Sequence, residues 1–352
     1  MSRFEYKQNF IRFIGDIEPT KDSKPRVGDC WYNTNLNKVC TYLPNNTWDC
    51  LSVYNSTGVV AGGYSAKSSI ENIIFPFDSG TAPVSWYLAT ARTIPTPCSS
   101  SQFGFFCGGG VDPTYYSTID RIDYNVKNTT ATIITYLSQA KRIGGGVNSS
   151  CCGYFAGEQL GTTYYSTISK ITFPFDSGIP LSTSKLTIAR RDCIGVQSSQ
   201  FGFFCGGVST QSYSKIDRIT FSSDTGTASS VGNLIVPNCE TANFESETSG
   251  FICGGNENNA GQYSSRITRF AFPFDSGTTS IVGSTASAAR VTSYGCNASS
   301  YGYIAAGAVS NVPTIVSSVE RIIFPFDSGI ASNSGNLAIS VYNHTATDNT
   351  LF

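Results

Sequence analysis

Histidine and methionine are almost absent from this chain of 352 residues, which contains one of each. The single histidine is His344, so catalytic or metal sites that need two imidazoles are excluded. Charged residues are also scarce, at 13% of the chain, and the formal net charge is −1. Because a phosphate backbone is held by clustered Lys and Arg, this composition argues against nucleic acid as a partner.

Long apolar runs are missing as well, so no membrane insertion is expected, and the N-terminus lacks the apolar core of a signal peptide. The chain is therefore expected to fold in a cytoplasm, with its twelve cysteines as thiols. Cys107, Cys205 and Cys253 share one repeat position and are expected to be small core side chains. Pairing across neighbouring strands stays open for a second set, namely Cys98, Cys193, Cys239 and Cys296.

Glycine, tyrosine and phenylalanine are abundant instead, with 34, 19 and 23 copies, which favours strands and turns over helices. Three sequence blocks recur six times in a fixed order. The first has the form Gly-aromatic-x-Cys/Ala-Gly-Gly and begins at Gly58, Gly104, Gly153, Gly202, Gly250 and Gly302. The second is Ile-x-Phe-Pro-Phe-Asp-Ser-Gly, and its Phe-Pro-Phe-Asp-Ser-Gly part is complete in the copies ending at Gly80, Gly178, Gly277 and Gly329. The third is Leu-x-x-Ala-Arg, as in Leu88 to Arg92.

Each block is interpreted as a strand, and Asp-Ser-Gly is interpreted as a tight turn. A period of about 49 residues fits one propeller blade of four short strands. The sequence therefore predicts an all-β fold in which residues 55–352 form a six-bladed β-propeller. The last unit ends after its third block, so the C-terminal strand is expected to close the ring against the Gly58 strand. An elongated β-solenoid is the alternative.

Strands that end in Gly-Gly at this period partly resemble kelch repeats, although the later Tyr and Trp positions of kelch units are not filled regularly. The full unit, Ile-x-Arg-Ile-x-Phe-Pro-Phe-Asp-Ser-Gly followed by the other two blocks, resembles repeat-bearing structural proteins of tailed bacteriophages. This resemblance covers Gly58 to the C-terminus. It implies a virion protein of the tail, fibre or peripheral type, assembled in the host cytoplasm.

Residues 28–54 form a second region, expected to be a small β module of three strands, after an arm or linker at 1–27. Its Gly-Asp-x-Trp-Tyr-Asn-Thr segment resembles a module of phage tail and fibre proteins, which implies docking of residues 1–54 to other virion chains. Trp31 and Trp48 are candidates for stacking on sugar rings. The competing interpretation is that these side chains form the core of a very small module.

We expect binding rather than catalysis, because no nucleotide fingerprint is present. The recurring Asp residues are expected to form the same turn in each blade, whereas an active site would need a single set of residues. No cofactor or metal is expected. Loops after the Gly-Gly strand vary in length and are rich in Tyr, Asn and Gln, which is typical of binding surfaces. The candidate ligand residues in these loops are Tyr115, Tyr116, Gln159, Tyr164, Asn256, Asn258 and Gln262.

The hypothesis is a non-catalytic propeller that attaches to a host glycan or protein, in a chain that could assemble as a homotrimer. Two alternatives remain open at this point. One is a cellular kelch-like scaffold that recruits partner proteins, and the other is a polysaccharide depolymerase that uses two carboxylates.

Overall fold

The computed structural model describes residues 56–350 except 112, 143, 223, 259–260, 287–288 and 310–313, together with the backbone of four strands before residue 52. The chain divides into two compact units, Met1–Asn55 and Ser56–Phe352. Every regular element in the described residues is a β-strand, in agreement with the predicted all-β class. No helix in this part of the chain is long and apolar enough to cross a membrane.

The first unit is a four-stranded sheet in the order β1-β2-β3-β4. Its strands are β1 (Ile11–Gly15), β2 (Cys30–Asn33), β3 (Lys38–Tyr42) and β4 (Trp48–Leu51). β1 pairs with β2 in parallel, and the other pairs are antiparallel. Three strands were expected here; β1 adds a fourth from the segment expected to be an arm. The side chains of Trp31 and Trp48 lie outside the described residues.

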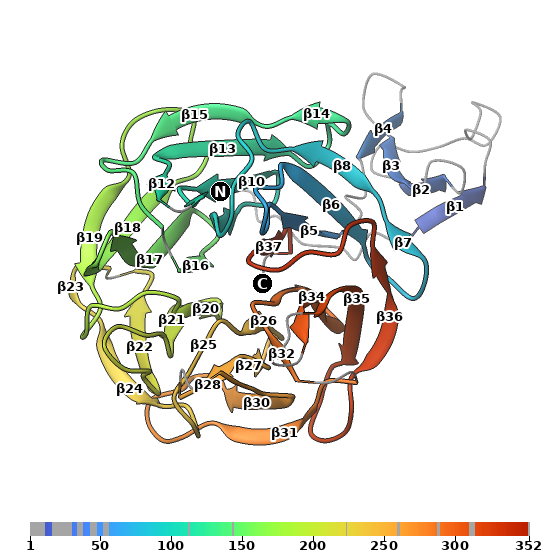
Figure 1. Cartoon of the computed structure of the whole chain (residues 1–352). Helices are drawn as coiled ribbons and strands as arrows, with labels where there is room; N and C mark the ends of the chain where they lie inside the picture. Colours follow the sequence, from blue (N-terminus) through green and yellow to red (C-terminus); the bar gives the residue numbers. More distant parts are fainter. Residues whose placement is uncertain are drawn as a thin grey trace, which may run out of the picture. The chain divides into compact units, whose positions relative to one another are not determined.

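The second unit consists of six blades arranged around a central axis (Figure 1). Blade 1 contains β37 (Thr345–Asp348), β5 (Thr57–Ala61), β6 (Ser69–Ile74) and β8 (Val84–Tyr87). Blade 2 contains β9 (Thr96–Ser99), β10 (Phe103–Cys107), β13 (Thr118–Asp123) and β15 (Thr132–Tyr136). Blade 3 contains β16 (Gly145–Asn148), β17 (Cys152–Leu160), β18 (Thr163–Thr172) and β19 (Leu181–Lys185).

The remaining blades repeat this order from the axis outward. Blade 4 contains β20 (Ile194–Gln197), β21 (Phe201–Cys205), β22 (Lys215–Thr220) and β24 (Ser229–Asn233). Blade 5 contains β26 (Ala242–Glu245), β27 (Ser249–Cys253), β30 (Arg266–Ala271) and β31 (Ser280–Ser284). Blade 6 contains β33 (Tyr294–Ala298), β34 (Tyr301–Val309), β35 (Thr314–Ile323) and β36 (Ser332–Leu337).

Short strands supplement the blades. In the loops, β11 (Gly110–Val111) pairs with β12 (Thr114–Tyr115), and β28 (Asn256–Glu257) pairs with β25 (Asn238–Cys239) and β29 (Gln262–Tyr263). β32 (Arg290–Val291) extends blade 6. On the rim, β7 (Thr81–Ala82), β14 (Thr129–Thr130) and β23 (Gly226–Thr227) pair in parallel with β36, β8 and β19. The outermost strand of these blades is therefore hydrogen-bonded to the next blade.

Closure of the ring follows the prediction. β37 pairs antiparallel with β5, with Thr345 opposite Ala61 and Asp348 opposite Gly58. The first blade is thus completed by the C-terminal strand, and the two ends of the propeller meet in one sheet (Figure 1). Because the C-terminal strand completes the first blade and closes the ring, the solenoid alternative does not apply.

Aromatic stacking joins neighbouring blades. The first Phe of the Phe-Pro-Phe block stacks on an aromatic residue of the preceding blade at ring-centroid distances of 5.0–5.5 Å, in the pairs Phe75–Tyr303, Phe173–Phe105, Phe272–Phe203 and Phe324–Phe251. The expectation that Phe-Pro-Phe continues a strand is wrong, because β6, β18, β30 and β35 end just before it. The block instead lies in a bend that places its first ring between two blades.

The Asp of each full Asp-Ser-Gly block has a role beyond the expected turn. Each carboxylate pairs with an Arg from the third strand of the preceding blade, in the pairs Arg121–Asp176, Arg218–Asp275, Arg269–Asp327 and Arg321–Asp78. Three of these guanidinium groups also lie over an aromatic ring, at 4.5–4.8 Å from its centroid. The repeated Asp and Arg residues therefore connect the blades.

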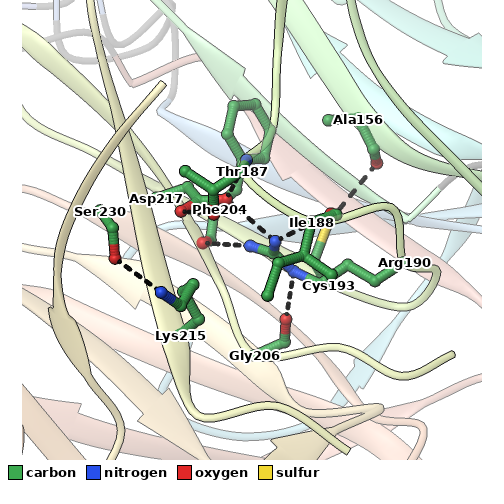
Figure 2. A network of polar contacts seen from close by, with 10 residues as sticks. All are labelled: Ala156, Thr187, Ile188, Arg190, Cys193, Phe204, Gly206, Lys215, Asp217 and Ser230. Carbon is green, nitrogen blue, oxygen red and sulfur yellow. Dashed lines mark hydrogen bonds and ion pairs between the residues drawn. The ribbon is translucent and has the colours of Figure 1, made fainter. Parts of the chain in front are cut away.

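The third block is not a strand, contrary to the prediction, because the outer strand ends before it and a turn follows. Its Arg points into the next blade and pairs there with a buried carboxylate. Arg190 Nη1 lies 2.9 Å from Asp217 Oδ2, and the same guanidinium donates to the carbonyls of Phe204 and Gly206 (Figure 2). The equivalent pairs are Arg92–Asp120 and Arg290–Glu320. In blade 3 Ser169 occupies the position of Asp217, and Lys141 pairs instead with Glu158 of β17.

The junction between blades 6 and 1 lacks this cation. Val341 occupies the Arg position there, while Glu71 still occupies the carboxylate position and accepts a hydrogen bond from the Ala338 N–H at 2.7 Å. Glu71 is 2% exposed, and burial raises its pKa from 4.5 to about 7. The seam where the ring closes therefore contains a buried carboxyl group without the guanidinium that pairs with its equivalents Asp120, Asp217 and Glu320.

The nine cysteines within the described residues are thiols. Cys107, Cys205 and Cys253 are fully buried in the blade cores, as predicted. The cross-strand pairing left open for Cys98, Cys193, Cys239 and Cys296 is not formed. Cys98 instead makes a thiol hydrogen bond with Cys107, and burial raises the pKa of Cys98 well above its usual value.

Candidate functional site

The two ends of the propeller differ in what they present. Because the four strands of a blade run antiparallel, the connections between second and third strands lie at the same end as the segments that lead into the next innermost strand. We call this end the loop face. The Phe-Pro-Phe-Asp-Ser-Gly bends lie at the opposite end, which we call the turn face. The loops predicted to bind a ligand therefore surround the axis on one face.

A ring of strained backbone surrounds the axis on the loop face. The residue two positions before the innermost strand has a positive φ in five blades: 47° at Ile94, 52° at Asp192, 57° at Glu240, 52° at Thr292 and 54° at Asn343. The residues are linked by backbone hydrogen bonds such as Ile94 N–H to Asn343 O, at 2.8 Å. Positive φ is costly for residues with a side chain, most of all for β-branched ones, and is typical of functional sites.

A charged cluster occupies part of this ring. Asp192 accepts one hydrogen bond from Arg142 at 2.9 Å and one from Arg191 at 2.6 Å, on different carboxylate oxygens. Both Arg side chains are 24% exposed, so they are held in place yet open to a ligand. Burial and the Asp192 charge raise the pKa of Glu240. Burial lowers the pKa of Arg142, but the Asp192 carboxylate and the other negative groups nearby raise it, and the net pKa of Arg142 lies above its usual value.

A cavity of about 210 Å³ opens beside this cluster. Its lining residues are Thr93, Gly110, Tyr115, Arg142, Gln159 and Arg191. Backbone hydrogen bonds fix its walls. The Arg142 N–H donates to the Gln159 carbonyl at 3.1 Å, and the Gln159 N–H donates to the Arg142 carbonyl at 2.8 Å. Thr93 and Gly110 form the same pair of backbone hydrogen bonds. The structure thus brings two of the predicted ligand residues, Tyr115 and Gln159, to one cavity.

The other predicted residues are placed differently. Asn256 forms a side-chain hydrogen bond with Glu240 and accepts one from the Gly261 N–H at 3.1 Å, so it supports the charged cluster. Tyr164 lies opposite Gln159 in the β17–β18 hairpin. Tyr116 is half-buried and does not line the cavity, while Asn258 is exposed in its loop. The Gln262 side chain lies outside the described residues, like those of Trp31 and Trp48.

Sequence reasoning missed Arg142, Arg191, Asp192 and Glu240. A signal was present, because these residues follow the third block at positions where other repeats have Thr93, Ile94, Val291 and Thr292. Charges at a position that is otherwise neutral indicate a local departure from the repeat. The departures that lead to these four residues lie in the segments before the innermost strands and not in the loops after Gly-Gly.

The axis itself is filled by a polar ring nearer the turn face. The fourth residue of each innermost strand has a polar side chain: Ser99, Asn148, Gln197, Glu245, Asn297 and Asp348. These side chains accept backbone N–H groups of the preceding blade, for example Ser99 N to Asn148 Oδ1 at 2.8 Å and Asn297 N to Asp348 Oδ2 at 2.9 Å. The axial cavity left between them is about 50 Å³. The ring therefore joins the blades and leaves room only for a few waters.

No protein-family profile matches the chain, and no curated protein is similar to it at a significant level. Within the described residues, no three His, Cys, Asp or Glu side chains gather in a way that could hold a metal ion. The charged cluster and the cavity beside it offer two guanidinium groups, two carboxyl groups, the Gln159 amide and the Tyr115 ring.

Proposed function

We propose that this chain is a virion protein of a tailed phage whose propeller attaches to a host surface glycan through the loop face, without acting on it chemically. The observation that carries the proposal is the 210 Å³ cavity in which Tyr115, Gln159, Arg142 and Arg191 converge. Concave sites with a few fixed polar groups and an aromatic ring suit a saccharide, because the ring offers apolar contact and the polar groups orient the hydroxyls.

The charged cluster favours an acidic sugar. Arg142 and Arg191 line the cavity and share one carboxylate partner, Asp192. The single negative charge of Asp192 therefore balances only one of the two guanidinium charges. The neighbouring Glu240 has a raised pKa and is the weaker source of negative charge. A carboxylate on the ligand would be met by charge-assisted hydrogen bonds, for which the guanidinium fork is well shaped.

The rest of the chain fits an attachment role. Met1–Asn55 is a separate compact unit, and the proposal assigns to residues 1–54 the docking to other virion proteins. The phage-type motif in that unit and the repeat blocks of the propeller support this assignment by resemblance. A homotrimer, as in many fibre proteins, belongs to the same proposal.

A depolymerase is the second candidate, because the charge of Asp192 acts on Glu240 and the two carboxyl groups have different partners in the charged cluster beside the cavity. Two carboxyl groups in different environments are the minimum that glycoside hydrolysis needs. The attachment role is preferred because Asp192 is already engaged on both oxygens by Arg142 and Arg191.

The test is binding of the full chain to acidic polysaccharides from bacterial envelopes, measured by biolayer interferometry, with neutral polysaccharides as the reference. Arg191→Gln and Tyr115→Ala should each weaken binding of the acidic polymer by about tenfold or more, equivalent to roughly 1.4 kcal/mol. Arg218→Gln is the matched control, since it removes a partly exposed, ion-paired guanidinium away from the cavity. Equal affinity of all variants would contradict the proposal, and release of reducing sugar would favour the depolymerase.

A further inference from the structure

Two adjacent cysteines at the turn face have an arrangement that none of the other described cysteines shares. Cys151 and Cys152 lie at the end of the turn between β16 and β17, and their sulfur atoms are 3.3 Å apart. Cys151 is exposed, whereas the other eight cysteines of the described residues are buried. Cys151 is therefore the thiol in this part of the chain that a dissolved reagent can reach directly.

The surroundings of Cys151 favour its thiolate form. Hydrogen bonds from the Cys152 thiol and the Ser149 hydroxyl lower the pKa of Cys151, and the Lys170 charge acts in the same direction. Burial raises the pKa of Cys152, so the two thiols are unequal. A thiolate is the nucleophile in thiol–disulfide exchange, and a basic side chain nearby is typical of reactive cysteines.

The local structure holds the pair together. Ser149 Oγ accepts the Cys152 N–H at 3.0 Å and lies 3.6 Å from Cys151 Sγ. Lys170 is fixed by Asp224 at 2.5 Å, and Asp224 also accepts the Tyr154 hydroxyl at 2.8 Å. The hydrogen bonds among Lys170, Asp224 and Tyr154 thus hold the Lys170 ammonium group in place.

We propose that Cys151 and Cys152 form a redox-active dithiol that exchanges with low-molecular-weight disulfides. The Cys151 thiolate attacks one sulfur of the reagent disulfide, whose S–S bond breaks, and the first thiolate leaves and takes up a proton. Cys152 then loses its proton to solvent and attacks the Cys151 sulfur, which releases the second thiolate. Two protein thiols are oxidised to one internal disulfide, and the reagent is reduced to two thiols.

A bond between adjacent residues is expected to be readily reversed. Consecutive Cα atoms are about 3.8 Å apart, which is shorter than the usual span across a disulfide. Strained and exposed disulfides are the labile ones that serve regulation. The dithiol would therefore respond to a change from a reducing to an oxidising medium, and this inference does not depend on the proposed function.

The experiment treats the full chain with oxidised glutathione at neutral pH and locates the products by intact-mass analysis and peptide mapping. Wild type should lose two hydrogens between Cys151 and Cys152 and retain no glutathione there. Cys152→Ala should keep a stable glutathione adduct on Cys151, and Cys151→Ser should leave Cys152 unmodified. Cys107→Ser is the matched control and should behave like wild type.

A second measurement follows alkylation of Cys151 by iodoacetamide against pH in the otherwise unmodified chain. Lys170→Gln should shift the midpoint of this profile upward, because the cation that favours the thiolate is removed. A lasting glutathione adduct on wild-type Cys151, or an unreacted pair in the presence of oxidised glutathione, would overturn the proposal. An unchanged alkylation profile in Lys170→Gln would overturn the role given to Lys170.

Discussion

Glu71→Gln tests the seam where the propeller closes. The Glu71 carboxyl is 2% exposed and accepts the Ala338 N–H, and Val341 occupies the sequence position of the Arg that pairs with the equivalent carboxylates Asp120, Asp217 and Glu320. Burial raises its pKa from 4.5 to about 7. A difference of about 2.5 pH units corresponds to about 3 kcal/mol, at roughly 1.4 kcal/mol per unit.

The sign follows from proton linkage. Between about pH 4.5 and pH 7 the folded chain keeps a proton on Glu71 that the unfolded chain has lost, so the free energy of unfolding falls as the pH rises. The contribution of Glu71 is fully present below pH 4.5 and is lost once the pH passes 7. Burial also raises the pKa of Asp348, on the closing strand, to about 7, which adds a trend in the same direction.

The assay is urea unfolding of wild type and Glu71→Gln at several pH values from 4.5 to 8, followed by tryptophan fluorescence. Glutamine stays neutral, so the variant should gain stability over wild type as the pH rises, by up to about 3 kcal/mol at pH 8. Glu247→Gln, at an exposed carboxylate in blade 5, is the control and should follow wild type. Parallel pH curves for wild type and Glu71→Gln would refute the reasoning.

Two further predictions concern the contacts between blades. Asp217→Ala leaves the buried Arg190 guanidinium without its carboxylate and should cost about 3–5 kcal/mol in the free energy of unfolding, measured by urea unfolding; a loss below 1 kcal/mol would contradict this. Gly146→Ala places a Cβ at 1.8 Å from the Pro97 carbonyl oxygen, so the innermost strands of blades 2 and 3 must separate. We expect a loss of about 2 kcal/mol or more and a lower melting temperature by calorimetry, whereas an unchanged melting temperature would argue against such close approach.

The architecture could be predicted because residues that recur in every repeat mark the strands of each blade. Gly104, Gly153 and their equivalents mark one strand in every blade, and the incomplete last unit indicated closure by the C-terminal strand. The third block was misinterpreted because its buried Arg has no partner nearby in the sequence. Arg190 and Asp217 are 27 positions apart and belong to neighbouring blades, so their pairing appears only when the blades are assembled.

The candidate site was harder to predict for the same reason. Tyr115 and Gln159 were identified from the composition of their loops, but Arg142 and Asp192 are 50 positions apart and meet only around the closed ring. Local patterns predict strands and turns, since these depend on neighbours in sequence. Contacts between successive blades connect residues that are distant in sequence, and the signal for the charged cluster is visible only when the repeats are compared with one another.

Charged residues distinguish positions that hold the blades together from positions that belong to the candidate site. Where a charged residue recurs from blade to blade, as Asp176 and its equivalents do, its partner lies in the preceding blade and the pair serves assembly. Where a charge departs from the repeat, as at Asp192 and Glu240, it lies on the strained ring around the axis. Assembly uses the same contact at several junctions between blades, whereas a binding site is needed once, so the departures are the residues to mutate first when the ligand is sought.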